Sequence, residues 1–391
     1  MTTDASNLIV LLLVIGARLL VPLAIPRYPL PASIAALVID GVDKSILQAY
    51  TTLSLDAYQS YDKALDIYYL SIQYLTMLRL WVNLDAFRMG RLLYYFRMVG
   101  VLFFELLQAR PLLLLFPNTF EYFFLFYEGV RVRWNPRRMG VPLVIGAAFV
   151  IWVAIKIPQE YWIHIAQLDA TDAIKEHLFG VPVDMRWLEI ARERTGIVVA
   201  VVLAVVAAIV IARRAIATLC PPFDWPPRFA AAADEREVSP EAANVERRAG
   251  ANRLFDTALF EKFALVALVT TIFSRILPNV SITVGQTVFG VALVVIVNTA
   301  VSHELVRRGV LWSSALVEFV VMAAVNGATA VLFFALRPIG AGSIDRPALL
   351  FSLLLLTLLV TMFDRFSPYY RVRVAREDRS APRSAAAAVA D

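Results

Sequence analysis

The sequence predicts an all-α polytopic integral membrane protein with about eleven, alternatively ten, transmembrane helices. Hydrophobic residues occupy 59% of the 391 positions, against about 45–50% in a soluble globular domain. The mean hydropathy is +0.67, and long apolar runs recur along most of the chain. These runs are continuous and do not alternate with period two, which favours spanning helices over the strands of a membrane barrel.

Eleven apolar segments have lengths suited to crossing a bilayer. In chain order they are residues 7–25, 30–49, 66–82, 90–108, 111–129, 141–157, 196–212, 259–277, 283–302, 311–336 and 348–364. The second segment is the least typical because it carries Asp40, Asp43 and Lys44. If it is re-entrant or lies along the outer surface, the count falls to ten and the N-terminus moves inside.

The positions of the arginines predict the orientation. Arg131, Arg133, Arg137 and Arg138 lie in the short loop after the fifth segment, which places that loop in the cytoplasm by the positive-inside rule. Alternation then places the other strong arginine clusters on the same side and makes the C-terminus cytoplasmic. Arginine greatly outnumbers lysine, and alanine and valine abound, as in proteins from GC-rich bacterial genomes. We therefore expect the bacterial cytoplasmic (inner) membrane.

The chain divides into parts of different character. In order they are a polar-cored, tyrosine-rich membrane half (1–195) with an extracytoplasmic segment (158–195), a connecting transmembrane helix (196–212), a cytoplasmic linker (213–257), a Val/Ala/Leu-rich scaffold half (258–366) and a cytoplasmic tail (367–391). Proline, alanine and alternating charge in the linker predict a flexible segment. The distal part of the tail, which ends in an alanine run, is expected to be disordered.

Composition excludes several classes of protein. The single cysteine, Cys220, excludes a disulfide framework and a multi-cysteine metal or iron–sulfur site. The net charge is +5, but the arginines lie in short loops between apolar runs, which fits membrane topology and argues against nucleic acid as a partner. The sequence contains no glycine-rich phosphate loop, serine-nucleophile elbow or zinc-protease helix motif.

A polar stripe follows one face of the third segment. Asp62, Asp66, Tyr69, Gln73 and Thr76 recur at steps of four, three, four and three residues, a spacing that keeps all five side chains on one side of a helix. Their neighbours are apolar enough for a bilayer. Because ionisable groups in hydrocarbon are costly, they normally face a protein interior or a water-filled cavity.

Neighbouring segments offer polar faces as well, and such faces are most stable when they bury one another. The candidates for a polar pathway or an active site are Asp40, Asp43, Lys44, Asp62, Asp66, Tyr69, Gln73, Arg79, Arg91, Tyr95, Glu105, Glu121, Glu160 and His164. The alternative is a core of ion pairs and tyrosine hydrogen bonds that fixes helix packing. Glu160 and His164, at i and i+4, are a weak candidate pair of metal ligands. No cofactor is predicted.

Three functions fit these features. The first is a transporter or channel that moves a cation, a proton or a small polar solute along the polar interior of the first half. The second is a membrane-embedded enzyme that acts at the extracytoplasmic leaflet on a lipid-linked sugar or a phospholipid, with a divalent cation possible and with Lys44 and Arg110 free to contact phosphate. The third is a non-catalytic subunit of a membrane complex. The lipid bilayer is a partner in all three.

Overall fold

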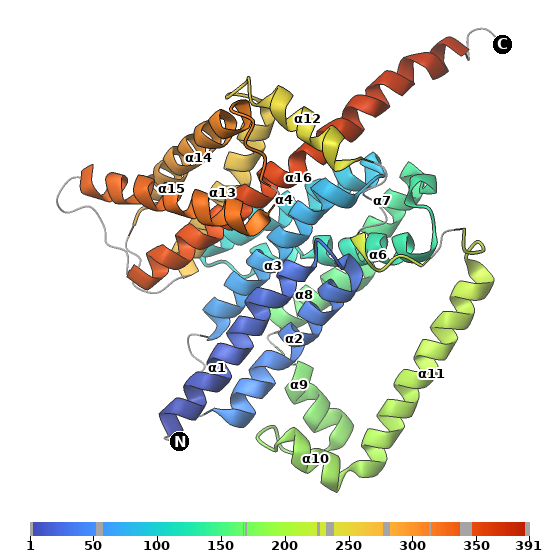
Figure 1. The fold of residues 1–391 in the computed structure, drawn as a ribbon. Coiled ribbons are helices and arrows are strands. Elements are labelled where there is room, and N and C mark those ends of the chain that lie inside the picture. The colour runs from blue at the N-terminus through green and yellow to red at the C-terminus, as the bar shows by residue number, and fades with distance from the viewer. Residues whose placement is uncertain are drawn as a thin grey trace.

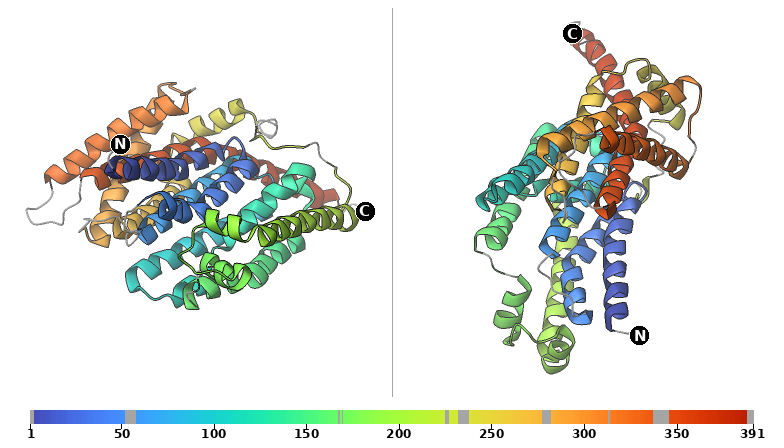
Figure 2. Two further views of the ribbon diagram at one scale, coloured as in Figure 1. Left: turned by 90° about the horizontal axis from the view of Figure 1, so that it is seen from below. Right: turned by 90° about the vertical axis from the view of Figure 1, so that its left-hand side faces the viewer.

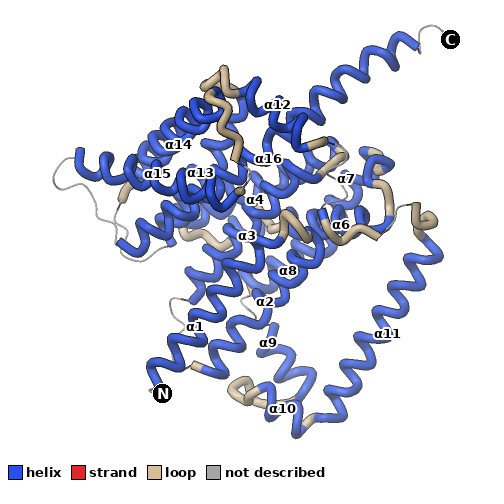
Figure 3. The backbone as a smooth tube through the Cα atoms, in the orientation of Figure 1, coloured by secondary structure: helices blue, strands red, loops and turns tan. Residues whose placement is uncertain are grey.

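The computed structural model describes residues 3–51, 58–166, 168, 170–224, 227–231, 238–276, 282–312, 314–336 and 346–387. Throughout these residues the regular structure is helical, and no strand occurs in them (Figure 3). The all-helical class predicted from the sequence is therefore confirmed. The two termini lie at opposite ends of the molecule (Figure 2, right).

Seven helical stretches within the described residues are long and apolar enough to cross a membrane, which indicates a membrane-embedded protein. They are Ser6–Ala24 (α1, Thr3–Leu20, with η1, Val21–Ala24), Val141–Ile165, Thr195–Thr218 in α11 (Thr195–Leu219), Thr257–Ile276 (α13), Val284–Arg307 (α14), Ala315–Phe333 in α15 (Ala315–Leu336) and Arg346–Arg379 in α16 (Arg346–Ala387). Each corresponds to one of the eleven predicted segments.

The four other predicted segments are helical but carry more charge. Three of them are α2 (Pro29–Tyr50), α3 (Tyr58–Leu80) and α4 (Leu84–Leu107). Local chemistry explains two of the starts. Pro29 stands at the first position of α2, where a missing N–H costs nothing. The Asn83 side chain accepts a hydrogen bond from the Ala86 N–H at 2.9 Å and caps α4.

The predicted fifth segment, 111–129, is wrong as a continuous helix. It is divided into α5 (Pro111–Leu115) and α6 (Thr119–Arg133). Pro117 explains the break, since a residue before proline avoids the helical region, and Phe116 has φ −115° and ψ 65°. With 15 residues, α6 is about 22 Å long at 1.5 Å per residue, shorter than a hydrocarbon core of about 30 Å.

Helix α3 is the central helix of the fold (Figure 1). It packs against α1, α2, α4 and α6 of the first half and against α13 and α16 of the second. From Ile67 to Leu78 every residue is buried. Over this stretch the helix is surrounded by protein, so the stripe residues Tyr69, Gln73 and Thr76 face other helices, as the sequence predicted for costly polar groups.

The two halves are joined by polar contacts as well as by apolar packing. The Tyr74 hydroxyl of α3 donates a hydrogen bond to Glu261 of α13. The Arg373 guanidinium of α16 donates to the carbonyl oxygens of Leu78 and Arg79 at 2.5 and 2.7 Å, at the end of α3. The second half is therefore joined to the first along α3.

Several boundaries differ from the sequence prediction. The predicted sixth span, 141–157, continues to Ile165 as α7 (Val141–Val150), η3 (Ile151–Lys156), α8 (Ile157–Glu160) and η4 (Tyr161–Ile165), with π-helical hydrogen bonding in η3 and η4. Segment 170–193 contains the short elements α9 (Ala170–Ala173), η5 (Ile174–Phe179) and α10 (Trp187–Glu193), and η2 (Pro136–Arg138) lies between α6 and α7. Helix α11 stands apart from the bundle (Figure 1).

The linker and the tail also contain helix where the sequence predicted flexibility. Helix α12 (Pro240–Gly250) lies within the predicted linker and is capped by the Ser239 side chain, which accepts from the Ala242 N–H at 3.2 Å. Helix α16 continues to Ala387. Residues 388–391 lie outside the described part of the chain.

Candidate functional site

A single arginine gathers four aspartates from two other helices. Arg18 lies in the last turn of α1. Its Nη2 is 2.5 Å from Asp40 and 2.9 Å from Asp66, and its Nη1 is 2.9 Å from Asp62 and also contacts Asp43. Asp40 and Asp43 come from α2, and Asp62 and Asp66 come from α3. We call these five residues the Arg18 cluster.

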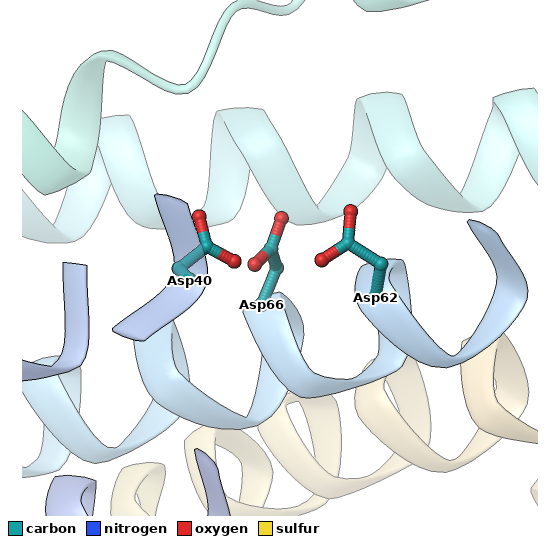
Figure 4. A group of neighbouring side chains, drawn as sticks. All are labelled: Asp40, Asp62 and Asp66. Atoms are coloured by element: carbon teal, nitrogen blue, oxygen red, sulfur yellow. The ribbon is translucent and has the colours of Figure 1, made fainter. Parts of the chain in front are cut away.

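The members of the Arg18 cluster differ in exposure. The side chains of Arg18 and Asp43 are only 5% and 2% exposed, so this ion pair forms the closed base of the cluster. The side chains of Asp40, Asp62 and Asp66 are 36%, 37% and 42% exposed. Figure 4 shows these three carboxylates directed toward one another. The cluster thus has a buried counter-ion pair and an accessible set of oxygens.

Charge within the Arg18 cluster is unbalanced, with four carboxyl groups around one guanidinium. Carboxylates held this close repel one another, and the repulsion is relieved by a shared proton or by a bound cation. Asp40 lies near the middle of α2, far from either helix end. Ionisable groups at such a position are costly and normally serve a function.

A cavity of about 40 Å³ adjoins the cluster. Its polar wall is formed by Arg18, Asp40, Asp66, Tyr69, Asn118 and Glu121, and its apolar wall by Pro22, Ala36 and Leu70. This volume exceeds the roughly 10–15 Å³ that one water molecule needs. The cavity can therefore hold an ion with a water molecule, and Glu121 of α6 adds a fifth carboxyl group beside it.

Asn118 stands at the break between α5 and α6 and lines the same cavity. Its Nδ2 donates to Glu121 Oε2 at 2.9 Å, and its backbone N–H donates to Glu160 Oε1 at 3.0 Å. Its Oδ1 is buried and has no hydrogen-bond partner within the described residues, although asparagine at this position usually caps its own helix. The residue is 9% exposed, so an unused acceptor lines the cavity.

Glu160 forms a second polar group behind Asn118. Besides the Asn118 N–H, it contacts His164 Nε2 at 3.0 Å and Lys156 Nζ at 3.9 Å. Lys156 also donates to Gln159 at 2.8 Å. Both oxygens of Glu160 are thus engaged by protein donors. Glu160 and His164, the weak candidate metal pair, thus lie in contact at the predicted i, i+4 spacing.

The stripe on α3 continues away from the cluster for two turns and then ends. The Gln73 Nε2 donates to the Tyr69 hydroxyl at 2.6 Å, and Tyr69 donates to the Ser33 carbonyl at 3.3 Å. The Gln73 Oε1 is buried without a partner in the residues that the structure describes. Thr76 donates to Ile72 of its own helix at 2.8 Å. Gln73 and Thr76 are fully buried, so in this conformation the stripe is closed to solvent beyond Tyr69.

Five predicted site residues lie elsewhere. Lys44 is exposed, and its backbone N–H donates to Asp43 at 2.5 Å. Glu105 pairs with Lys63 at 3.7 Å. Arg91 lies 3.8 Å from Glu261, whose carbonyl accepts from Tyr95 at 3.5 Å. Arg79 stacks over Phe366 at 5.5 Å. The contacts of Glu105, Arg91, Tyr95 and Arg79 join separate helices and lie outside the Arg18 cluster.

The candidate set predicted from the sequence omits two residues that line the cavity, Arg18 and Asn118. Arg18 is the single charged residue within the first apolar segment, and a lone arginine in such a run calls for a buried partner. Asn118 follows Pro117 inside another apolar segment, and a proline there is a signal for a helix break. The sequence shows both features, but it does not show which residues Arg18 and Asn118 contact, because those contacts depend on how the helices pack.

Comparison with known proteins gives no relative for this chain. No protein-family model matches it, and no curated protein or solved structure is significantly similar to it. The case for function therefore depends on the site itself.

Proposed function

We propose that the protein is a membrane transporter or channel that moves a proton or another small cation, and that the Arg18 cluster is its binding site. The observation that carries this proposal is the excess of carboxyl groups over guanidinium in the middle of the helical bundle, open to a cavity. A polar cluster that only fixes helix packing needs equal numbers of positive and negative side chains. Surplus carboxylates at membrane depth are typical of proton relays and cation pathways.

The broken helix beside the cavity supports the same proposal. Many transporters bind their substrates where a membrane helix is interrupted, because the interruption frees backbone and side-chain polar groups inside the protein. Here the break between α5 and α6 places Asn118 and Glu121 on the cavity wall. The path beyond Tyr69 and Gln73 is closed, so in the proposal this conformation is an occluded state.

We further propose eleven spans, a cytoplasmic C-terminus and the inner membrane of a bacterium. The opposite positions of the termini support an odd number of crossings (Figure 2). Arginines of two helices lie near one end of the bundle: Arg373 of α16 binds the end of α3, and Arg88 of α4 lies 3.9 Å from Glu377 of α16. Such a gathering is expected of the cytoplasmic end of a bundle.

Proton flux into liposomes tests the proposal. The full-length protein is reconstituted with a pH-sensitive dye inside, and a potassium diffusion potential drives uptake. Asp66→Asn is compared with Asp85→Asn, a matched control whose side chain is 44% exposed and pairs with Arg88 at 2.9 Å away from the cluster. We expect Asp66→Asn to lose at least about tenfold in rate, or 1.4 kcal/mol of barrier, and the control to keep it. Equal rates for wild type and Asp66→Asn would refute this proton route.

A further inference from the structure

We propose that the Arg18 cluster binds one divalent cation through carboxylate oxygens of Asp40, Asp62 and Asp66, with the carbonyl oxygen of Asn118 as a neutral oxygen at the same cavity. This inference deepens the proposed function, on which it rests, by naming the class of cation. Hard divalent cations such as Mg²⁺, Mn²⁺ and Ca²⁺ take oxygen ligands from carboxylates, amide carbonyls and water.

The spacing of the oxygens fits such an ion. One carboxylate oxygen from each of Asp40, Asp62 and Asp66 lies within 4.8 Å of the others. Ions that bind oxygen at about 2.0–2.6 Å hold neighbouring and opposite ligands about 3–5 Å apart. The three side chains converge from α2 and α3 (Figure 4), so no large movement of the backbone is needed to bring them around one ion.

Asn118 supplies the independent observation. Its Oδ1 is buried on the cavity wall and accepts no hydrogen bond from any described residue, while its Nδ2 is held by Glu121 at 2.9 Å. That hydrogen bond fixes the orientation of the amide, so that within the described residues Oδ1, and not Nδ2, has no hydrogen-bond partner. A buried carbonyl oxygen without a donor is unfavourable, and a cation or its bound water would satisfy it.

Arg18 occupies the position that the ion would take. Its Nη2 bridges Asp40 and Asp66 at 2.5 and 2.9 Å, while its Nη1 contacts the buried Asp43. Binding of a cation therefore exchanges the two Nη2 contacts and the Nη1 contact with Asp62 for metal ligands, while the Nη1 contact with Asp43 stays in place. Arg18 acts in this account as a tethered competitor that keeps the site neutralised when it is empty.

This role gives the proposal a distinctive test. Removing the guanidinium with Arg18→Gln takes a positive charge away from the site, so the variant should bind the divalent cation more tightly than the wild type. If Arg18 only held the aspartates in place, its loss would instead weaken binding. Arg18→Lys, which keeps the charge, should bind no more tightly than the wild type.

The experiment titrates the purified full-length protein in detergent with Mn²⁺ and follows free Mn²⁺ by electron paramagnetic resonance. We expect one Mn²⁺ per chain, displaced by Mg²⁺ or Ca²⁺. Asp40→Asn and Asp66→Asn should each weaken binding at least about tenfold, Arg18→Gln should tighten it by about tenfold, and Asp85→Asn should leave it unchanged. Circular dichroism checks that each variant is folded.

Two results overturn the inference: Mn²⁺ binding that is as tight in folded Asp66→Asn as in the wild type, or weaker binding in folded Arg18→Gln. If Arg18→Gln does not fold, the Asp40 and Asp66 variants decide the question alone. Failure here is distinct from failure of the proposed function. If Asp66→Asn loses proton flux but the wild type binds no Mn²⁺, the divalent site is overturned and the transport proposal stands. If the wild type binds Mn²⁺ but carries no flux of protons or Mn²⁺, the transport proposal is overturned.

Discussion

Arg18→Gln removes a cation that pairs with Asp43, a carboxylate whose side chain is only 2% exposed. Breaking a buried ion pair by deleting one partner costs about 3–5 kcal/mol, because the other charge stays buried without its counter-charge. The contacts to Asp40, Asp62 and Asp66 add less, since these side chains are 36–42% exposed and solvent screens them. We therefore expect Arg18→Gln to destabilise the protein by about 4 kcal/mol.

The double variant Arg18→Gln/Asp43→Asn shows whether this reasoning is right. With the buried carboxylate also neutralised, the double variant should recover at least half of the stability lost in Arg18→Gln. The assay is reversible unfolding of the purified protein in mixed micelles, followed by tryptophan fluorescence in a double-mutant cycle. Strictly additive costs would refute the claim that Arg18 and Asp43 form a coupled buried pair.

The same cycle can be applied with ligand present. Because Arg18→Gln leaves more negative charge around the proposed ion position, millimolar Mn²⁺ should stabilise this variant more than it stabilises the wild type, by RT ln(1 + [L]/Kd) for each protein. The measurement is the shift of the unfolding midpoint with Mn²⁺ concentration. Equal shifts for the two proteins would contradict the competitor role of Arg18.

Two further predictions concern the frame around the site. Glu128 is 0% exposed and accepts hydrogen bonds from Trp81 Nε1 at 2.8 Å and from Arg131 Nε at 2.6 Å. Glu128→Ala should therefore lower the free energy of unfolding by about 3 kcal/mol. Glu128→Gln, which keeps an acceptor for Trp81, should lower it by less in the same unfolding assay. A Cβ on Gly100 would lie 2.1 Å from the Phe116 Cβ, so Gly100→Ala should displace the α5–α6 break and destabilise the protein by about 1–3 kcal/mol. An unfolding midpoint equal to that of the wild type would contradict this prediction, because it would mean that Phe116 moves aside at no cost.

The sequence was sufficient to predict the class of fold and part of the site. Apolar runs identify helices because every backbone polar group in lipid must be satisfied within its own helix. Helical spacing placed Asp62 and Asp66 on one face and Asp40 and Asp43 on another, and the structure brings those faces together around Arg18. Periodicity along one helix is a local property, so it can be read from the sequence.

Contacts between helices could not be predicted in the same way. Glu105 and Arg91 have the same helical spacing as the aspartates of the Arg18 cluster, yet they pair with Lys63 and with Glu261 of the second half. The division of the fifth segment depends on Pro117, whose effect on one turn of helix was hidden by the apolar residues around it. Packing around α3 decides which polar faces meet. Such contacts join residues far apart in the chain, so helical spacing within one segment does not predict them.

The proton flux of Asp66→Asn in liposomes, measured beside that of Asp85→Asn, tests the central claim most directly. The two aspartates are exposed to a similar degree, 42% and 44%, but only Asp66 belongs to the Arg18 cluster. We predict that flux falls at least about tenfold in Asp66→Asn and is unchanged in Asp85→Asn. Flux that is equal in the two variants and in the wild type would contradict the claim that this cluster handles a transported proton.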